Sequence, residues 1–204
     1  MYIPSIYQFD NQEEKIAFMQ KYSFATLITN KEGIPIATHL PFVVEKRNDK
    51  LILSAHFSLA NEQANYIEDQ VCLVVFSEPH AYISPSLYEK KDNVPTWDYM
   101  AVHAYGKAKI FSKEEDKIRL LEAMIAYYEK AYQTQWTTIS ETYKQGLLNG
   151  IVAFEIEVTE LQGQKKLSQN KSSAEIDRIA THLENSSSAS EKELAKYLRN
   201  NLEH

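Results

Sequence analysis

The sequence PHAYISPSLYEKKDNVPTWDYMAVHAYGK, residues 79–107, decides the fold expected for this chain. It holds two of the six histidines, one of the two tryptophans and three of the six prolines. We interpret it as a strand, a long loop and a second strand that starts near Val102. Large loops on a rigid scaffold often carry binding residues, whereas a lid would only pack its aromatic side chains on the sheet. The polar and aromatic loop residues are Ser84, Ser86, Tyr88, Trp97 and Tyr99.

The composition is that of a globular chain of one domain, or of one domain with an appendage. It has 204 residues, a formal net charge of −6 and a pI near 5.6, so no overall basic footprint for DNA is present. The single cysteine, Cys72, lies in the apolar run VCLVVF and is expected to be a core residue in a cytoplasmic protein. We expect no signal peptide and no membrane span. Leu202-Glu203-His204 resembles the remnant of a purification tag.

Short strands joined by turns dominate the rest of the chain. This pattern favours a mainly β fold with flanking helices (α+β), built on an antiparallel barrel rather than on βαβ units. We expect a barrel domain over residues 1–165 and a C-terminal helical appendage over 166–201. The predicted strands are 24–29, 34–44, 51–56, 71–76, 82–83, 102–111 and 151–158, and the predicted helices are 11–22, 58–70, 112–131, 138–148, 173–183 and 190–202. We expect turns at Lys31-Glu32-Gly33 and within 46–50, an N-cap at Asn11 and a capping box at 112–115.

Four histidines fall near the ends of separate predicted strands, where they could share one site. They are His39, His56, His80 and His103. Histidine is the commonest metal ligand, but no HExxH or paired-cysteine spacing is present, so we predict no metal. No glycine-rich phosphate loop is present either. The expected helix start at 58–61 could bind an anion through its backbone N–H groups, or could be an ordinary N-cap.

The two C-terminal helices invite a helix-turn-helix interpretation. Five basic and five acidic residues lie between Lys171 and Asn201. A recognition helix should be richer in lysine and arginine. A helical pair that packs on the barrel or on a partner is therefore favoured.

Six motifs in order resemble those of the PaiB-type negative transcriptional regulators, a branch of the FMN-binding split-barrel proteins. Together they cover nearly the whole chain. They are MYIP (1–4), PIATHLP (35–41), PHAYISPSLY (79–88), VPTWDY (94–99), VHAYGKA (102–108) and KLSQNK (166–171).

The resemblance implies a Greek-key, antiparallel split barrel, a homodimer with a flavin-type pocket between protomers, and repression of protease and sporulation genes. DNA is then an expected partner and FMN the expected cofactor, with haem as the alternative. Two departures from the family pattern bear on flavin binding. Ala55 replaces a glycine, and Asp98 replaces an asparagine with a carboxylate that would repel a nearby phosphate.

We expect one ligand pocket, in which aromatic side chains stack on a flat ring and a few polar groups orient it. A regulator without catalytic residues is favoured, and an FMN-dependent oxidoreductase or a haem-binding protein is the alternative. His56 is expected to meet the phosphate. The predicted cofactor-binding residues are Thr38, His39, His56, Asn61, Trp97, Tyr99 and His103.

Overall fold

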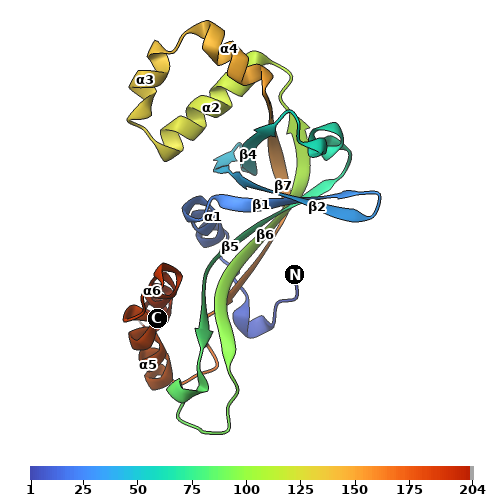
Figure 1. Cartoon of the computed structure of the whole chain (residues 1–204). Coiled ribbons are helices and arrows are strands. Elements are labelled where there is room, and N and C mark those ends of the chain that lie inside the picture. Colours follow the sequence, from blue (N-terminus) through green and yellow to red (C-terminus); the bar gives the residue numbers. More distant parts are fainter. Residues whose placement is uncertain (203–204) are drawn as a thin grey trace. The chain divides into compact units, whose positions relative to one another are not determined.

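The computed structural model describes residues 1–202, which divide into two compact units (Figure 1). We call the first the helix-pair unit; it comprises Met1–Lys15, Ser77–Val102 and Gln162–His204. The second, the barrel unit, comprises Ile16–Phe76 and His103–Leu161. The domain boundary predicted at residues 165 and 166 stays a prediction, and residues 203 and 204 of the expected tag remnant lie outside the described part.

A seven-stranded antiparallel sheet of order β2-β1-β5-β6-β7-β4-β3 forms the scaffold. The expected mainly β class with flanking helices is confirmed. Three of its strands run from one unit into the other. The strands are β1 (Phe24–Lys31), β2 (Ile34–Pro41), β3 (Val43–Arg47), β4 (Lys50–Ser58), β5 (Val71–Ile83), β6 (Thr96–Ile110) and β7 (Ile151–Lys166).

Two tight hairpins fix the register of the outer strands. Glu32 and Gly33 join β1 to β2, and Asn48 and Asp49 join β3 to β4; all four have positive φ. Two central residues with positive φ are typical of type I′ turns, whose twist matches that of paired strands. The turns predicted at Lys31-Glu32-Gly33 and within 46–50 are therefore confirmed.

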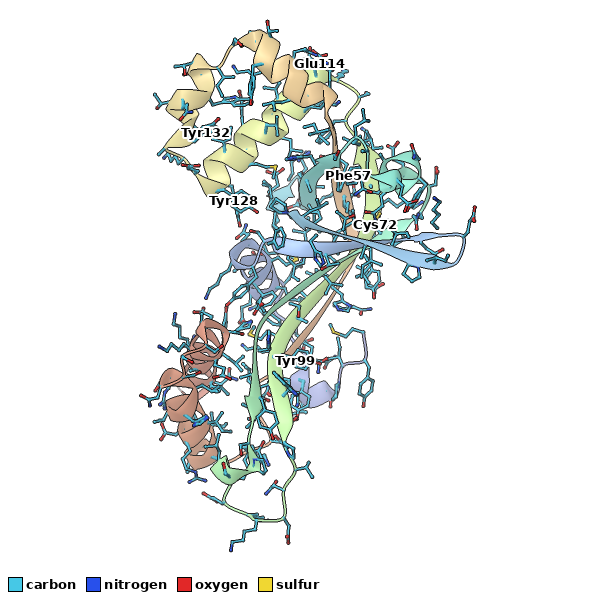
Figure 2. The ribbon with its side chains drawn as sticks, viewed as in Figure 1. Phe57, Cys72, Tyr99, Glu114, Tyr128 and Tyr132 are labelled. Carbon is cyan, nitrogen blue, oxygen red and sulfur yellow. The ribbon has the colours of Figure 1, made fainter. Side chains whose placement is uncertain are left out.

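The barrel unit encloses a core of phenylalanine and aliphatic side chains. Phe42 lies 6.0 Å from Phe76 between ring centroids, and Phe154 lies 4.9 Å from Phe57. Figure 2 marks Phe57 and Cys72 on strands of this unit, and both are buried. Burial of each such side chain stabilises the fold by about 1.5–3 kcal/mol.

Gly106 is required where β6 passes β7. A Cβ atom there would lie 2.2 Å from the carbonyl oxygen of Glu157. The VHAYGKA motif therefore has a packing role at this position, besides any role in binding.

Three helices of the barrel unit lie together in Figure 1: α2 (Glu114–Tyr128), α3 (Tyr132–Thr138) and α4 (Glu141–Asn149). Leu120 and Met124 of α2 pack with Val43 and Ala153 of the sheet. The capping box predicted at 112–115 is wrong, because Lys113 is the N-cap and makes no side-chain cap hydrogen bond. Helix α3 had not been expected.

The helix-pair unit contains α5 (Ser173–Glu184) and α6 (Ala189–Leu202), both close to their predicted bounds. Arg199 of α6 donates to Glu184 and Thr181 of α5 and also pairs with Asp177. One of the five basic side chains is thereby occupied within the pair. Three further helices are η1 (Ser5–Tyr7), α1 (Gln12–Lys21) and η4 (Pro85–Leu87).

Three sequence expectations need correction. The predicted helix 58–70 is wrong: only two short 3-10 turns form there, η2 (Glu62–Asn65) and η3 (Ile67–Asp69). The predicted strand 34–44 divides at Phe42 into β2 and β3, which occupy opposite ends of the sheet order. Trp97 and Tyr99 lie on β6 rather than in the loop, and residues 82–83 belong to β5. None of the described helices has the length and apolarity to cross a membrane.

Candidate functional site

A polar network joins the strands β1 and β2 to the 3-10 turn η2. Asn61 Nδ2 donates to Thr38 Oγ1 (3.0 Å), and the Thr38 hydroxyl donates to Gln63 Oε1. Gln63 Nε2 donates to Thr29 Oγ1 (2.8 Å) and to the carbonyl of Ile36 (3.3 Å). Gln63 is fully buried. Its side-chain amide holds Thr38, and its backbone N–H donates to Asn61 Oδ1 (3.0 Å).

The network leaves hydrogen-bonding capacity at its outer edge. Thr38 and Asn61 are half-buried, and only one N–H of the Asn61 amide has a partner among the described residues. An amide NH₂ group has two donors, so its second N–H is left to donate to a ligand oxygen. The sequence had named Thr38 and Asn61 but not Gln63 or Thr29, because a buried glutamine carries no local pattern.

The turn before this network cannot serve as the expected anion site. The backbone N–H groups of Leu59, Ala60 and Asn61 donate to Gly150, Ser58 Oγ and the Ser58 carbonyl. The 3-10 turn η2 that follows has only four residues. A phosphate would therefore have to be met by side chains, because these donors are already used.

His39 lies on an exposed face of β1, β2 and β5. Its Nδ1 lies 3.0 Å from Thr26 Oγ1, and its ring stacks beside Phe24 with centroids 6.4 Å apart. Residues directly opposite across a strand pair share one face, so the register defines what we call the open sheet face. Phe24 is 69% exposed on it. The open sheet face comprises Phe24, Thr26, Ile28, Ala37, His39, Leu73 and Val75.

His103 occupies a half-buried position of β6. Burial lowers the pKa of its imidazole, and its Nδ1 is buried with no partner among the described residues. A neutral imidazole with an unused nitrogen is suited to hydrogen bonding with a neutral ligand.

His56 faces a different environment from Thr38 and Asn61. It lines a cavity of about 280 Å³ with Leu121, Met124 and Trp136 of the helices α2 and α3. Burial lowers the pKa of His56, which favours its neutral form. This apolar surrounding is poorly suited to the phosphate contact expected from the sequence.

Trp97 and Tyr99 belong to the helix-pair unit, where Figure 2 marks Tyr99 on β6. Trp97 is 54% exposed and contacts the rings of His80 and Tyr82, with centroids 6.0 and 5.9 Å away. His80 thus lies beside Trp97 rather than at a metal site. Among residues 1–202, no cluster of three histidine, cysteine or acidic side chains could hold a metal ion.

Asp98 follows Trp97 in the sequence, but its side chain is fully buried. Ser168 Oγ donates to its Oδ2 (2.6 Å), while Oδ1 has no partner among the described residues. Burial raises the pKa of this carboxyl, although Ser168 and Lys166 act in the opposite direction. The carboxylate that the sequence placed near a phosphate is thus a buried group held by Ser168.

Comparison with known proteins gives the class. Residues 1–160 match the family described as "Putative FMN-binding domain", and the chain belongs to this family. Two solved structures have the same fold: the FAD and heme binding protein from Mycobacterium smegmatis (TM-score 0.62, 12% identity, covering 78% of this chain and 73% of that one), and the flavocytochrome Anf3 from Azotobacter vinelandii (TM-score 0.61, 16% identity, covering 76% and 67%). The expected flavin-binding split-barrel fold is confirmed.

One relative is similar over its whole length. The protein named "Protease synthase and sporulation protein PAI 2" from Bacillus subtilis (strain 168) is 38% identical over 205 residues, which cover 99% of this chain and 98% of that protein. The resemblance to PaiB-type proteins is confirmed. A protein of Saccharomyces cerevisiae, YKL070W, is 42% identical over 86 residues, covering 39% of this chain and 51% of that protein.

The side chains of the barrel unit fit FMN, the cofactor that the family implies. Asn61 offers an unused N–H, and His103 an unused ring nitrogen. Flavin carbonyls, ring nitrogens and ribityl hydroxyls are partners of this kind. Lys31, the basic side chain linked to this region, is paired with Glu62 at 2.5 Å, so it offers the phosphate a shared rather than a free charge.

Proposed function

We propose that the protein is a flavin-binding negative regulator of transcription, with protease and sporulation genes as its targets. The observation that carries this is full-length similarity to a protein named for protease synthesis and sporulation, together with the family's FMN-binding domain. A cytoplasmic location fits the single unpaired cysteine.

The barrel unit supplies the hydrogen bonds to the flavin in this proposal. Asn61 donates from its second amide N–H, Thr38 holds Asn61 in place, and His39 and His103 offer ring nitrogens. Bound FMN would supply reversible electron transfer, or would act as the signal whose presence changes the protein. The expected stacking role of Trp97 and Tyr99 and the expected phosphate role of His56 stay proposals that substitution can test.

Titration of the purified protein with FMN, followed by flavin fluorescence, tests the site. Asn61→Ala should weaken FMN binding about two- to tenfold, which corresponds to the loss of one hydrogen bond. Asn65→Ala is the matched control, because Asn65 is exposed in the same turn. Equal FMN affinity in wild type and Asn61→Ala would contradict this site.

The oxidoreductase alternative makes a different prediction. No dinucleotide-binding fingerprint is present in the sequence, so we expect slow NAD(P)H oxidation by the flavin-loaded protein. Rapid and saturable oxidation would favour an enzyme over a regulator.

The haem alternative is motivated by the names of two structural neighbours, a flavocytochrome and a FAD and heme binding protein. An absorbance spectrum of the purified protein distinguishes bound flavin from bound haem. A flavin doublet supports the proposal, whereas a Soret band without flavin absorbance would replace FMN with haem.

A homodimer is also proposed. The open sheet face carries exposed or half-buried Phe24, Ile28, Leu73 and Val75, and apolar side chains that gather on one surface are typical of an interface. His39 belongs to this face, and Thr38 is the next residue on the same strand, so the proposed flavin site adjoins this surface.

DNA is the proposed partner of the regulator, although the net charge of −6 gives no general attraction to it. A gel-shift assay with operator DNA, with and without FMN, tests this part. If the protein binds promoter DNA neither with nor without FMN, at low or at high salt, it would have to regulate through another protein.

A further inference from the structure

The cavity beside His56 lies between the barrel strands and the helices α2 to α4. Its volume is about 280 Å³. An apolar cavity of about 150 Å³ is enough to hold benzene, so this space is large enough for two fused aromatic rings. All of its lining residues lie in the barrel unit.

The lining is apolar apart from one side chain. Leu121, Met124, Leu147 and Ile151 contribute aliphatic surface, and Trp136 contributes an aromatic face. The Trp136 Nε1–H already donates to Glu122 (3.4 Å), and Lys144 lies over its ring. The indole N–H is thus turned to a protein acceptor and does not serve the cavity.

His56 is the exception. It belongs to β4 opposite Ala153 of β7, and this register turns it toward the helices, whereas its neighbours Ala55 and Phe57 are buried. Its Nδ1 is buried and has no partner among the described residues. A buried polar atom without a partner is unfavourable, so a ligand that donates a hydrogen bond to the imidazole would recover part of that energy.

We propose that this cavity is a second ligand site, separate from the flavin site, for a small neutral aromatic molecule with one hydrogen-bond donor. The apolar lining excludes a charged ligand, because no opposite charge among the lining residues would compensate its desolvation. The imidazole accepts one hydrogen bond from the ligand, and Trp136 and Met124 contact its rings. Because α2 to α4 form one wall, occupancy would stabilise these helices against the sheet.

Indole and benzofuran form a matched pair of probes, since they have the same shape and only indole has an N–H. Isothermal titration should show that indole binds about two- to tenfold more tightly than benzofuran, as expected for one hydrogen bond. His56→Leu should remove this difference by weakening indole to the level of benzofuran. Equal binding of both probes to wild type would overturn the role of His56.

A cavity-filling variant locates the binding. Leu147→Trp should abolish binding of both probes. Ile125 also lines the cavity, so Ile125→Phe is a second filling variant, and thermal melts show whether each variant folds. Val94→Trp is the control, because Val94 is exposed in the other unit. Binding that survives in both filling variants, or no binding by wild type at millimolar indole, would overturn the proposal.

Discussion

Cys72 illustrates how burial sets the chemistry of a single residue. Its side chain is fully buried on β5, with the thiol 3.6 Å from the Ile67 carbonyl. Burial raises the pKa of the thiol to about 11, and the thiolate is the reactive form. We predict that a thiol reagent at about pH 8 modifies the folded protein on the order of a hundredfold more slowly than it modifies a free thiol. Unfolding in denaturant should restore the normal rate, and rapid reaction in the folded state would contradict the burial.

Asp98 makes the stability of the protein depend on pH. Burial raises the pKa of its carboxyl in the folded state, so the folded state binds more protons than the unfolded state just above the ordinary pKa. The free energy of unfolding therefore falls as the pH rises from about 4 through the folded-state pKa. Asp98→Asn should remove this contribution and raise the melting temperature near neutral pH.

Thermal melts of the two proteins across this pH range measure the effect. Asp92→Asn is the control, because Asp92 is exposed. A melting temperature of Asp98→Asn that is lower than wild type at neutral pH would show that Ser168 stabilises the carboxylate by more than burial disfavours it.

Some residues of the site could be predicted from the sequence and others could not. Thr38 was named through the PIATHLP motif and Asn61 through the expected helix start at 58–61, and the structure joins the two by a hydrogen bond. Gln63 was missed because its partners, Thr29 and Ile36, lie far away in the sequence. The placement of His56 with the flavin stays a prediction; the structure adds that His56 lines a cavity with residues of α2 to α4, which the sequence could not show.

At the scale of elements, short-range signals performed well. Asn11 accepts a hydrogen bond from the Glu14 N–H (3.1 Å) at the start of α1, as its position predicted. Two 3-10 turns form at 62–69 in place of the expected helix. Asn61 caps a turn of four residues, and the start of β5 at Val71 leaves too little chain for a longer helix. The predictions for strands β5 to β7 were too short. The missed parts carry aromatic and polar residues and lack a simple alternation of apolar and polar side chains.

The N-terminus of α5 provides a prediction for one element. Ser172 Oγ accepts from the Glu175 N–H (3.2 Å), and Glu175 accepts from the N–H groups of Ser172 and Glu89 (both 3.0 Å). This capping box links the helix to the segment after η4. Ser172→Ala should destabilise the protein by about 1 kcal/mol, seen as a lower midpoint in urea.

The same cap should weaken in acid. The backbone N–H donors lower the pKa of Glu175, so its contribution is present above the ordinary pKa of about 4.5 and is lost as the pH falls below it. Ser187→Ala is a control at an exposed serine. An equal loss of stability in both variants would show that the capping box is not the cause.

For the whole molecule, the uncovered part of the sheet matters most. Helix α2 packs against Val43 and Ala153 of the sheet, whereas the open sheet face keeps exposed or half-buried apolar side chains. Contact of these apolar side chains with water is unfavourable, and their burial in an interface would be favourable. The family resemblance predicted a dimer, and we propose that the open sheet face, defined by the register of β1, β2 and β5, forms its interface.

Phe24→Glu tests that surface. Phe24 is 69% exposed on the open sheet face, so the substitution leaves the barrel core intact but places a charge in the proposed interface, where it would be desolvated without a partner. Light scattering should give a dimer mass for wild type at micromolar concentration and a monomer mass for the variant. Interfaces of stable dimers commonly bury upwards of about 2,000 Å², and a charge buried there without a partner should weaken association by about tenfold or more. Tyr143→Glu is the matched control, since Tyr143 is 61% exposed on α4 and away from this face. A wild-type monomer, or a Phe24→Glu dimer as stable as that of Tyr143→Glu, would show that the open sheet face is not the dimer interface.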